Sequence, residues 1–271
     1  MGEKMVMRIF DPDVLQRSFS ELGLSDRELD LWNTLTTHTN GIILVTGPTG
    51  SGKTTTLYST LRNLADSKVN VCTIEDPIEM VEPSFNQIQV HQSIDLTFST
   101  GVRSLLRQDP DIIMIGEIRD LATAEMAIQA ALTGHLVLST LHTNDAPSAI
   151  TRLMELGLPA YLINASVLGI LAQRLVRTLC KHCKTELTSP AKPEGCLECR
   201  QTGYLGRIGL YEMLEMTQSL KKLVTPGGDL QHLRKQTKQD GLKTLRQSGA
   251  KKVALGLTTM SEVLRVTPFV D

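Results

Sequence analysis

The sequence has little that would carry a 271-residue chain into or across a membrane. No apolar run approaches the ~18 residues that a spanning helix requires, and the first residues do not have the pattern of a signal peptide. Neither sign of charge is in excess, because 28 Lys and Arg stand against 29 Asp and Glu. We therefore expect a cytoplasmic chain without a strong electrostatic attraction to nucleic acid or anionic lipid.

Aromatic residues are also scarce. They make up 4% of the chain and are not interleaved with a basic stripe, which argues against direct binding to a nucleic-acid strand. Basic residues gather near the C-terminus, where a solvated helix face accounts for them. The apolar share of 41% is enough for a sizeable core, and no internal repeat or low-complexity segment is present. The composition predicts one large domain with smaller additions.

Short apolar runs and helical patterns alternate from about residue 40 to residue 178. Strands are predicted over residues 41–47, 70–76, 111–118 and 135–143. Helices are predicted over residues 54–65, 98–109, 121–134, 145–157 and 160–179. This alternation predicts an α/β fold whose sheet is mostly parallel.

The two ends of the chain have other patterns. Residues 6–10 resemble a strand, and Ser25 with Glu28 forms a capping box at the start of a helix. Beyond the cysteines, residues 207–216 favour a strand or a strand and turn. Most of the remaining C-terminal sequence is predicted to be helical.

A glycine-rich segment joins the first strand of the α/β region to the helix that follows. It satisfies the pattern G-x-x-x-x-G-K-[ST]. Glycines let backbone N–H groups surround phosphate oxygens, and the helix N-terminus adds the positive end of its dipole. Lys53 would reach the β- and γ-phosphates, and Thr54 would offer its hydroxyl to Mg²⁺. The sequence predicts a site for a nucleoside triphosphate formed by Gly47, Pro48, Thr49, Gly50, Ser51, Gly52, Lys53, Thr54 and Thr55.

A second acidic element follows the strand predicted over residues 111–118. Four apolar residues precede Gly116 and Glu117, whereas a Walker B strand usually carries an Asp before the glutamate. We therefore expect Thr54, phosphate oxygens and water to hold Mg²⁺, with Glu117 acting through water. An ion pair with Arg119 is the alternative explanation for Glu117. No NKxD tetrapeptide is present, which argues against a guanine-reading switch.

Four segments together resemble a known family. The phosphate loop and residues 73–79 (TIEDPIE), 105–120 (LLRQDPDIIMIGEIRD) and 133–144 (TGHLVLSTLHTN) occur in the order seen in the secretion ATPase superfamily. Its members are the hexameric motors of type II secretion, type IV pili and related systems. The family calls these segments the Walker A motif, Asp box, Walker B motif and His box. The resemblance extends from about residue 5 to the end.

The resemblance implies a fold, an activity and partners. We expect a RecA-like P-loop NTPase core that hydrolyses ATP to ADP and phosphate with Mg²⁺. Six copies would form a ring at the cytoplasmic face of the inner membrane. The ring would associate with the membrane through a platform protein and an adaptor, with no direct contact to nucleic acid.

The Asp box offers candidates for the general base. Glu75, Asp76 and Glu79 leave a strand before a proline turn, which places them at the sheet edge where P-loop folds bind ligands. A carboxylate there can accept a proton from the attacking water. The resemblance implies that an acid of this box does so, and both Glu79 and Glu75 remain candidates. Capping of the loop is the alternative for each.

The two histidines of the His box have different expected roles. His135 and His142 lie seven positions apart on a strand and so point to opposite faces. His142 is at the C-terminal end of the strand, and the resemblance implies that it contacts the γ-phosphate. We expect His135 to be structural.

Several arginines are candidates for completing the nucleotide site of a neighbouring subunit. In the family, a neighbouring subunit supplies guanidinium groups that stabilise charge on the transferring phosphate. The resemblance points to Arg8 and Arg103, with Arg107 near it, and Arg119 and Arg207 are further candidates. A surface ion pair is the alternative for each arginine alone, but as a set they favour a ring.

Four of the five cysteines form the pattern C-x2-C-x12-C-x2-C. Two such hooks can surround Zn²⁺ with four thiolates, which is the closed type of structural site. The ligands would be Cys180, Cys183, Cys196 and Cys199, and free thiols or a redox pair are the alternatives. The four-cysteine insert resembles the assembly branch of the superfamily, namely type II secretion ATPases and pilus extension ATPases. The short loop between the hooks favours pilus assembly.

The motifs suggest four parts. Residues 1–33 would be the remnant of a preceding domain with a linker helix, and residues 34–178 the RecA-like core. Residues 179–207 would be the small zinc module, and residues 208–271 a helical C-terminal region. Our first hypothesis is a motor for pilus assembly or type II secretion. The alternatives are a DNA-uptake or conjugation-type motor, and a nucleotide-binding module without turnover.

Overall fold

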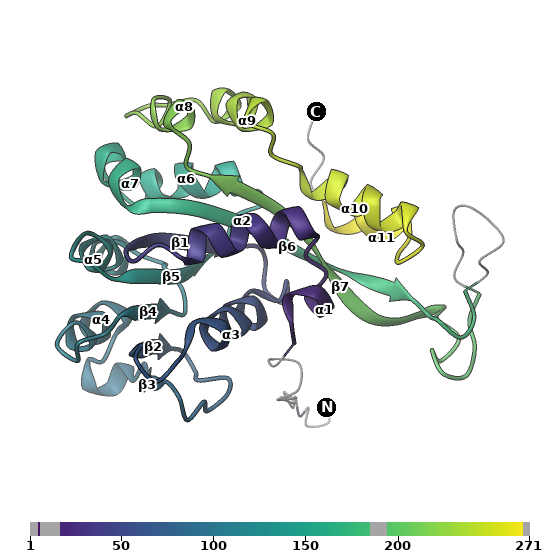
Figure 1. The fold of residues 1–271 in the computed structure, drawn as a ribbon, viewed down its shortest axis with the longest axis horizontal. Helices are drawn as coiled ribbons and strands as arrows, with labels where there is room; N and C mark the ends of the chain where they lie inside the picture. The colour runs from purple at the N-terminus through teal and green to yellow at the C-terminus, as the bar shows by residue number, and fades with distance from the viewer. Residues whose placement is uncertain (1–4, 6–16, 185–193, 268–271) are drawn as a thin grey trace, which may run out of the picture.

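A seven-stranded β-sheet organises the molecule, in the order β3-β2-β4-β5-β1-β6-β7 (Figure 1). The structure is a computed structural model that describes residues 5, 17–184 and 194–267. Its strands are β1 (Gly41–Thr46), β2 (Val71–Glu75), β3 (Asn86–Gln89), β4 (Ile112–Ile115), β5 (Leu136–Leu141), β6 (Val167–Leu179) and β7 (Tyr204–Glu215). All neighbouring strands are parallel except β6 and β7. The predicted α/β fold with a mostly parallel sheet is confirmed.

Helices connect the strands and continue beyond the sheet. They are α1 (Phe19–Leu22), α2 (Asp26–Thr36), α3 (Lys53–Leu64), α4 (Phe98–Leu105), α5 (Leu121–Leu132), α6 (Ala146–Glu155), α7 (Ala160–Ser166), α8 (Gln218–Lys221), α9 (Leu230–Gln239), α10 (Leu245–Ala254) and α11 (Met260–Val266). Within the part of the chain that the structure describes, no helix combines the length and apolar character needed to cross a membrane.

Apolar side chains pack on both faces of the sheet. Leu44 of β1 lies in one buried cluster, whereas Ile43 and Val45 lie in the other. Helices α4 to α7 contribute to the first cluster, and α2 and α3 contribute to the second. Because successive side chains of a strand point to opposite faces, a strand covered on both sides is apolar throughout. Packing on both faces holds the strands in place, and the loops described below start from the ends of these strands.

The capping box at the start of α2 is confirmed. The backbone N–H of Ser25 donates to a carboxylate oxygen of Glu28 at 2.7 Å. Farther along the helix, the Trp32 indole N–H donates to the Thr60 hydroxyl of α3 at 3.1 Å. The Trp32 hydrogen bond attaches α2 to α3, the helix that follows the phosphate loop. The strand expected at residues 6–10 lies outside the described residues.

The helix expected over residues 160–179 is wrong in its second part. Helix α7 ends at Ser166, and the chain continues as the long strand β6. Apolar runs do not distinguish a buried strand from a buried helix by their spacing. The missing information is β7, which comes from beyond the cysteines and pairs along β6. Strand β3 was also not predicted, because its sequence NQIQ is a polar edge strand.

Strands β6 and β7 extend as a long hairpin away from the other strands, with the cysteine segment at its far end (Figure 1). Strand β6 ends at Leu179, next to Cys180, and β7 begins at Tyr204. The strand predicted near residues 207–216 is thus confirmed as part of β7. Helices α8 to α11 confirm the helical character of the C-terminal region. The four-part division stays a prediction.

Candidate active site and cysteine cluster

A cavity of about 770 Å³ lies where several strands reach their C-terminal ends. Of the expected phosphate-loop residues, Thr49, Gly50, Gly52, Lys53, Thr54 and Thr55 line it, whereas Gly47, Pro48 and Ser51 do not. The Asp-box acids, Glu117 and His142 line the same cavity. Segments more than 60 residues apart in sequence therefore meet at one place, as the parallel sheet requires.

The phosphate loop runs from the end of β1 to the start of α3. Gly47, Gly50 and Gly52 all have positive φ angles, of 150°, 77° and 88°. A side chain at Gly47 would also collide with the main chain, because its Cβ would lie 2.5 Å from the Gln173 carbonyl oxygen. The buried Ser51 hydroxyl has no hydrogen-bond partner in the described part of the chain. This glycine-dependent curve at a helix N-terminus fits a phosphate group.

Lys53 begins α3, directly after this loop. Its Nζ donates to the carbonyl oxygens of Gly47 at 2.9 Å and Pro48 at 3.1 Å. Burial lowers the pKa of Lys53, Glu117 raises it, and Arg174 lowers it further. An anion in the cavity would favour the charged ammonium. The lysine is therefore placed to bind phosphate oxygens as a point charge.

The two candidate bases differ in their surroundings. Glu75 is 4% exposed, and its two carboxylate oxygens accept hydrogen bonds from Thr73 at 2.6 Å and Tyr58 at 2.7 Å. Burial and Glu75 raise the pKa of Tyr58, so the phenol keeps its proton. Glu79 is half-buried and also lines the cavity. Glu75 is thus held by fixed donors on both oxygens.

Glu117 follows β4 and faces two cavity residues. Its carboxylate lies 2.5 Å from an Arg119 nitrogen and 3.4 Å from His142 Nε2. Burial and the nearby Lys53 lower the pKa of His142, although Glu117 opposes this effect. The imidazole is therefore neutral at pH 7. The ion pair considered as an alternative for Glu117 is present, and the same carboxylate lines the cavity.

The remaining histidine and the arginines lie in different places. His135 Nδ1 hydrogen-bonds the Ala130 carbonyl at 2.8 Å, at the opposite end of β5. Arg119 and Arg207 line the cavity. Arg103 is exposed on α4 and does not line it, as is also true of Arg107 after that helix. Arg8 lies outside the described residues.

Gln173 of β6 is a cavity residue that the sequence did not indicate. It is 1% exposed, and its side-chain oxygen accepts from the Thr56 hydroxyl of α3 at 2.8 Å. A Cβ at Gly52 would lie 2.8 Å from its amide nitrogen. The residue was missed because its segment was interpreted as a helix. A correct strand assignment would have placed it beside the phosphate loop.

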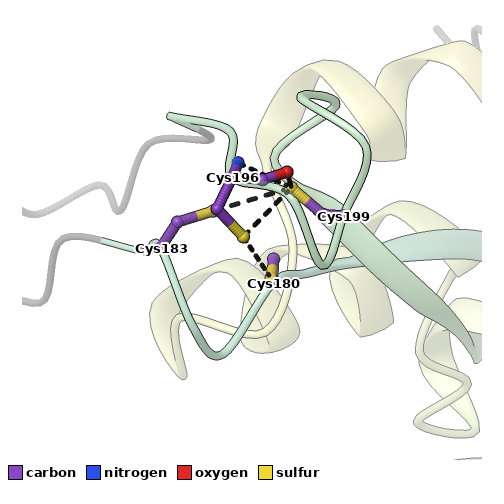
Figure 2. A group of neighbouring side chains, drawn as sticks. All are labelled: Cys180, Cys183, Cys196 and Cys199. Atoms are coloured by element: carbon purple, nitrogen blue, oxygen red, sulfur yellow. Dashed lines mark hydrogen bonds between the residues drawn. The ribbon is translucent and has the colours of Figure 1, made fainter.

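The four sequence-predicted cysteines come together at the end of the β6–β7 hairpin (Figure 2). Their sulfur atoms all lie within 4.8 Å of one another. The Cys180–Cys196 and Cys183–Cys199 Sγ pairs are each 3.8 Å apart. A tetrahedral Zn²⁺ site with bonds of about 2.3 Å has sulfur–sulfur edges of about 3.8 Å. The cluster therefore fits zinc.

Backbone donors support a thiolate in this cluster. The N–H groups of Cys196 and Gly203 donate to Cys199 Sγ at 3.1 and 3.2 Å. Although burial opposes it, these two backbone donors, together with hydrogen bonds from the Cys196 and Cys183 thiols, lower the pKa of Cys199 to about 6. Gly195 has a φ of 103°, and a Cβ there would lie 3.0 Å from the Gln201 carbonyl oxygen. The hook thus presents a sulfur that is ready to bind a metal.

Comparison with known proteins identifies relatives over nearly the whole chain. One is the type IV pilus assembly ATPase TfpB of Acinetobacter baylyi, which is 58% identical over 286 residues, covering 98% of this chain and 49% of that protein. Another is the type II secretion system protein HxcR of Pseudomonas aeruginosa, 50% identical over 266 residues, covering 98% and 57%. The chain spans about half the length of these curated relatives.

Solved structures agree with this relationship. The pilus retraction motor PilT, crystallised with bound ADP, matches with a TM-score of 0.73 and 32% identity over 93% of this chain and 67% of that one. The ATPase DotB of Legionella pneumophila matches with a TM-score of 0.71 and 28% identity, over 92% and 65%. A family model described as "Type II/IV secretion system protein" matches residues 1–265. The chain therefore belongs to the type II/IV secretion system protein family.

Proposed function

We propose that this chain is the ATP-hydrolysing part of a motor that drives type IV pilus assembly or type II secretion. The observation that carries the proposal is the single cavity shared by the phosphate loop, Glu117 and His142. Relatives named as a pilus assembly ATPase and a type II secretion system protein support it. Pilus assembly is favoured by the short loop between the cysteine hooks and by the 58% identity to TfpB.

In this proposal the phosphate loop and Lys53 hold the triphosphate. Thr54, with Glu117 acting through water, would hold Mg²⁺, which when bound neutralises charge on the phosphates. The neutral His142 would report the γ-phosphate to Glu117, because its Nε2 already lies 3.4 Å from that carboxylate. The two loops that carry these groups follow adjacent strands, β4 and β5.

Glu79 is the better candidate for the general base. A base must be able to approach the attacking water and accept its proton. Glu75 is only 4% exposed, so a water molecule has little room to approach its carboxylate. Glu79 lies at the same cavity with a half-buried side chain. We therefore assign Glu75 to holding the loop and Glu79 to activating water.

The exposed arginines support a ring of six copies. Arg103 lies outside its own cavity and is available to a neighbour. Arg119 and Arg207 would act from within the cavity. The ring would work at the cytoplasmic face of the inner membrane, against a platform protein and an adaptor. The cysteine cluster would hold a structural zinc ion at the end of the hairpin.

The direct test is nucleotide binding and ATP hydrolysis by the Lys53→Ala variant. Removal of this ammonium from the phosphate loop should abolish measurable turnover and weaken ATP binding at least ~10-fold. Lys68→Ala removes an exposed lysine elsewhere and serves as the matched control. Hydrolysis by Lys53→Ala at the rate of the parent chain would refute the phosphate-loop assignment.

A further inference from the structure

Arg174 of β6 is a buried arginine beside the phosphate loop. The residue is 5% exposed. Its Nη1 donates to the Gln173 carbonyl at 2.9 Å, and its Nη2 donates to the Asn144 carbonyl at 2.8 Å. A Cβ at Gly47 would lie 3.0 Å from Nη1. The planar guanidinium therefore lies between the first residue of the phosphate loop and the loop that follows His142.

The charge of Arg174 has no contact ion pair within the described ranges, although two acids are near enough to act on it. Glu212 and Asp145 both raise its pKa, against the larger effect of burial. Asp145 is engaged by Arg234, whose Nη2 lies 2.7 Å from a carboxylate oxygen, and it caps α6. Buried charges are ordinarily paired, so an anion bound in the cavity would compensate a guanidinium that the two acids reach only without direct contact.

Glu212 offsets only part of that charge. Its carboxylate accepts from the backbone N–H of Ala146 at 2.9 Å and of Leu245 at 3.2 Å, which begin α6 and α10. Burial raises the pKa of Glu212 to about 7, so the group is partly protonated at neutral pH. Lys53 lies close enough to Arg174 for the guanidinium charge to be among the effects that lower the lysine's pKa.

We propose that Arg174 is a positioning residue of the nucleotide site. Its guanidinium ties the loop after His142 to β6 through the Asn144 and Gln173 carbonyls and lies against Gly47 of the phosphate loop, and its charge stabilises the bound phosphates from beneath that loop. The inference rests on the proposed function and deepens it. It also assigns a role to β6, which carries both Gln173 at the cavity and Arg174 behind it.

The experiment is calorimetric titration of the folded chain with Mg·ATP and Mg·ADP. Arg174→Met removes the charge and the donors while keeping a long side chain, and Arg174→Lys keeps the charge but cannot reach both carbonyls. Arg234→Met is the matched control, because it removes another arginine that contacts the same loop through Asp145 but lies away from Gly47. Melting temperatures of all variants without nucleotide report purely structural effects.

We expect Arg174→Met to weaken ATP binding at least ~10-fold, and to weaken ADP binding less because ADP carries less charge. Arg174→Lys should fall between Arg174→Met and the parent chain. Arg234→Met should lower the melting temperature while keeping the ATP affinity within about twofold. A folded Arg174→Met variant with the parent affinity overturns the inference. Arg234→Met losing as much ATP affinity as Arg174→Met also overturns it.

Two further outcomes of the titration also decide. If Arg174→Met does not fold, Arg174→Lys decides: a loss of about threefold or more supports the inference, and parent-like ATP affinity refutes it. If the parent chain binds no ATP, the proposed function fails and this inference fails with it. Lys53-dependent ATP binding that is indifferent to Arg174 refutes only the positioning role.

Discussion

The nucleotide cavity and the cysteine cluster are built in opposite ways. The cavity draws on residues from Arg17 to Tyr211, carried by strands that are buried on both faces of the sheet. The cysteine cluster draws on two hooks within residues 180–199, at the end of a hairpin, where Leu197 is 87% exposed. The sheet can hold the first geometry without a ligand, whereas we expect the second to depend on the proposed zinc ion for much of its stability.

Metal removal should separate the two regions most clearly. Chelation, or Cys180→Ser, should release one equivalent of zinc and abolish amide protection around residues 194–204, because few buried apolar side chains would remain to hold that segment. Strands β1, β4 and β5 should keep their protection. Metal analysis and hydrogen exchange measure both effects.

The control for metal removal is the fifth cysteine. Cys72 is buried in β2 and lies outside the cluster, so Cys72→Ala should retain the metal. Unchanged protection of residues 194–204 after complete loss of metal would mean that the two regions do not differ in the way described. So would loss of protection in the central strands.

A carboxylate in the cavity should affect chemistry and leave stability nearly unchanged. Glu117→Gln should lower ATP turnover at least ~10²-fold while ATP binding persists, because in the proposed function this carboxylate acts on water and metal. Glu125→Gln on the exposed side of α5 is the matched control and should be neutral. Steady-state hydrolysis with calorimetric binding would test this. Parallel losses of binding and turnover would instead assign Glu117 to holding the loop through Arg119 and His142.

The attachment of the hairpin to α11 should respond to acid. Glu262 accepts from Arg177 of β6 at 2.6 Å and from Arg265. The Arg177 hydrogen bond, with help from Arg265, lowers the pKa of Glu262 from 4.5 to about 2. A lowered folded-state pKa means that the pair stabilises the protein above about pH 4.5 and loses this contribution as pH falls toward 2.

Two matched variants measure how much this ion pair contributes to the free energy of unfolding. Glu262→Gln should reduce the free energy of unfolding by about 2 kcal/mol at pH 7 and flatten its dependence between pH 4.5 and 2. Glu155→Gln breaks an exposed i,i+3 pair with Arg152 and should cost less than about 0.5 kcal/mol. Denaturant melts at several pH values measure both. An unaltered pH dependence in Glu262→Gln would contradict the role of this pair.

Strands β1, β2, β4 and β5 could be predicted because each is a short apolar run with a clear end. The capping box at Ser25 was also predictable, because its two residues are only three positions apart in the sequence. Strand β6 was not, because its apolar sequence fits a helix equally well and its partner β7 lies beyond the cysteines. The sequence therefore did not indicate which segments pair with each other across a long sequence separation.

The same distinction applies to the functional residues. The phosphate loop, Glu117 and His142 lie next to strands that were correctly predicted, and they line one cavity. Gln173 and Arg174 lie on the strand that was mistaken for a helix, and their positions beside Gly47 and Gly52 were not foreseeable. The cysteine spacing alone was enough to identify the four sulfur atoms that lie together in the structure. Arg103 remains a prediction, because its proposed target is in a neighbouring copy.

The most direct test of the account is ATP hydrolysis per chain measured over a range of chain concentrations, with Lys53→Ala as the background. The account predicts a specific rate that rises with concentration and is absent from Lys53→Ala, because a neighbour's arginine completes each cavity. A specific rate that depends on Lys53 but does not change with concentration would contradict it. Each chain would then be sufficient for hydrolysis by itself.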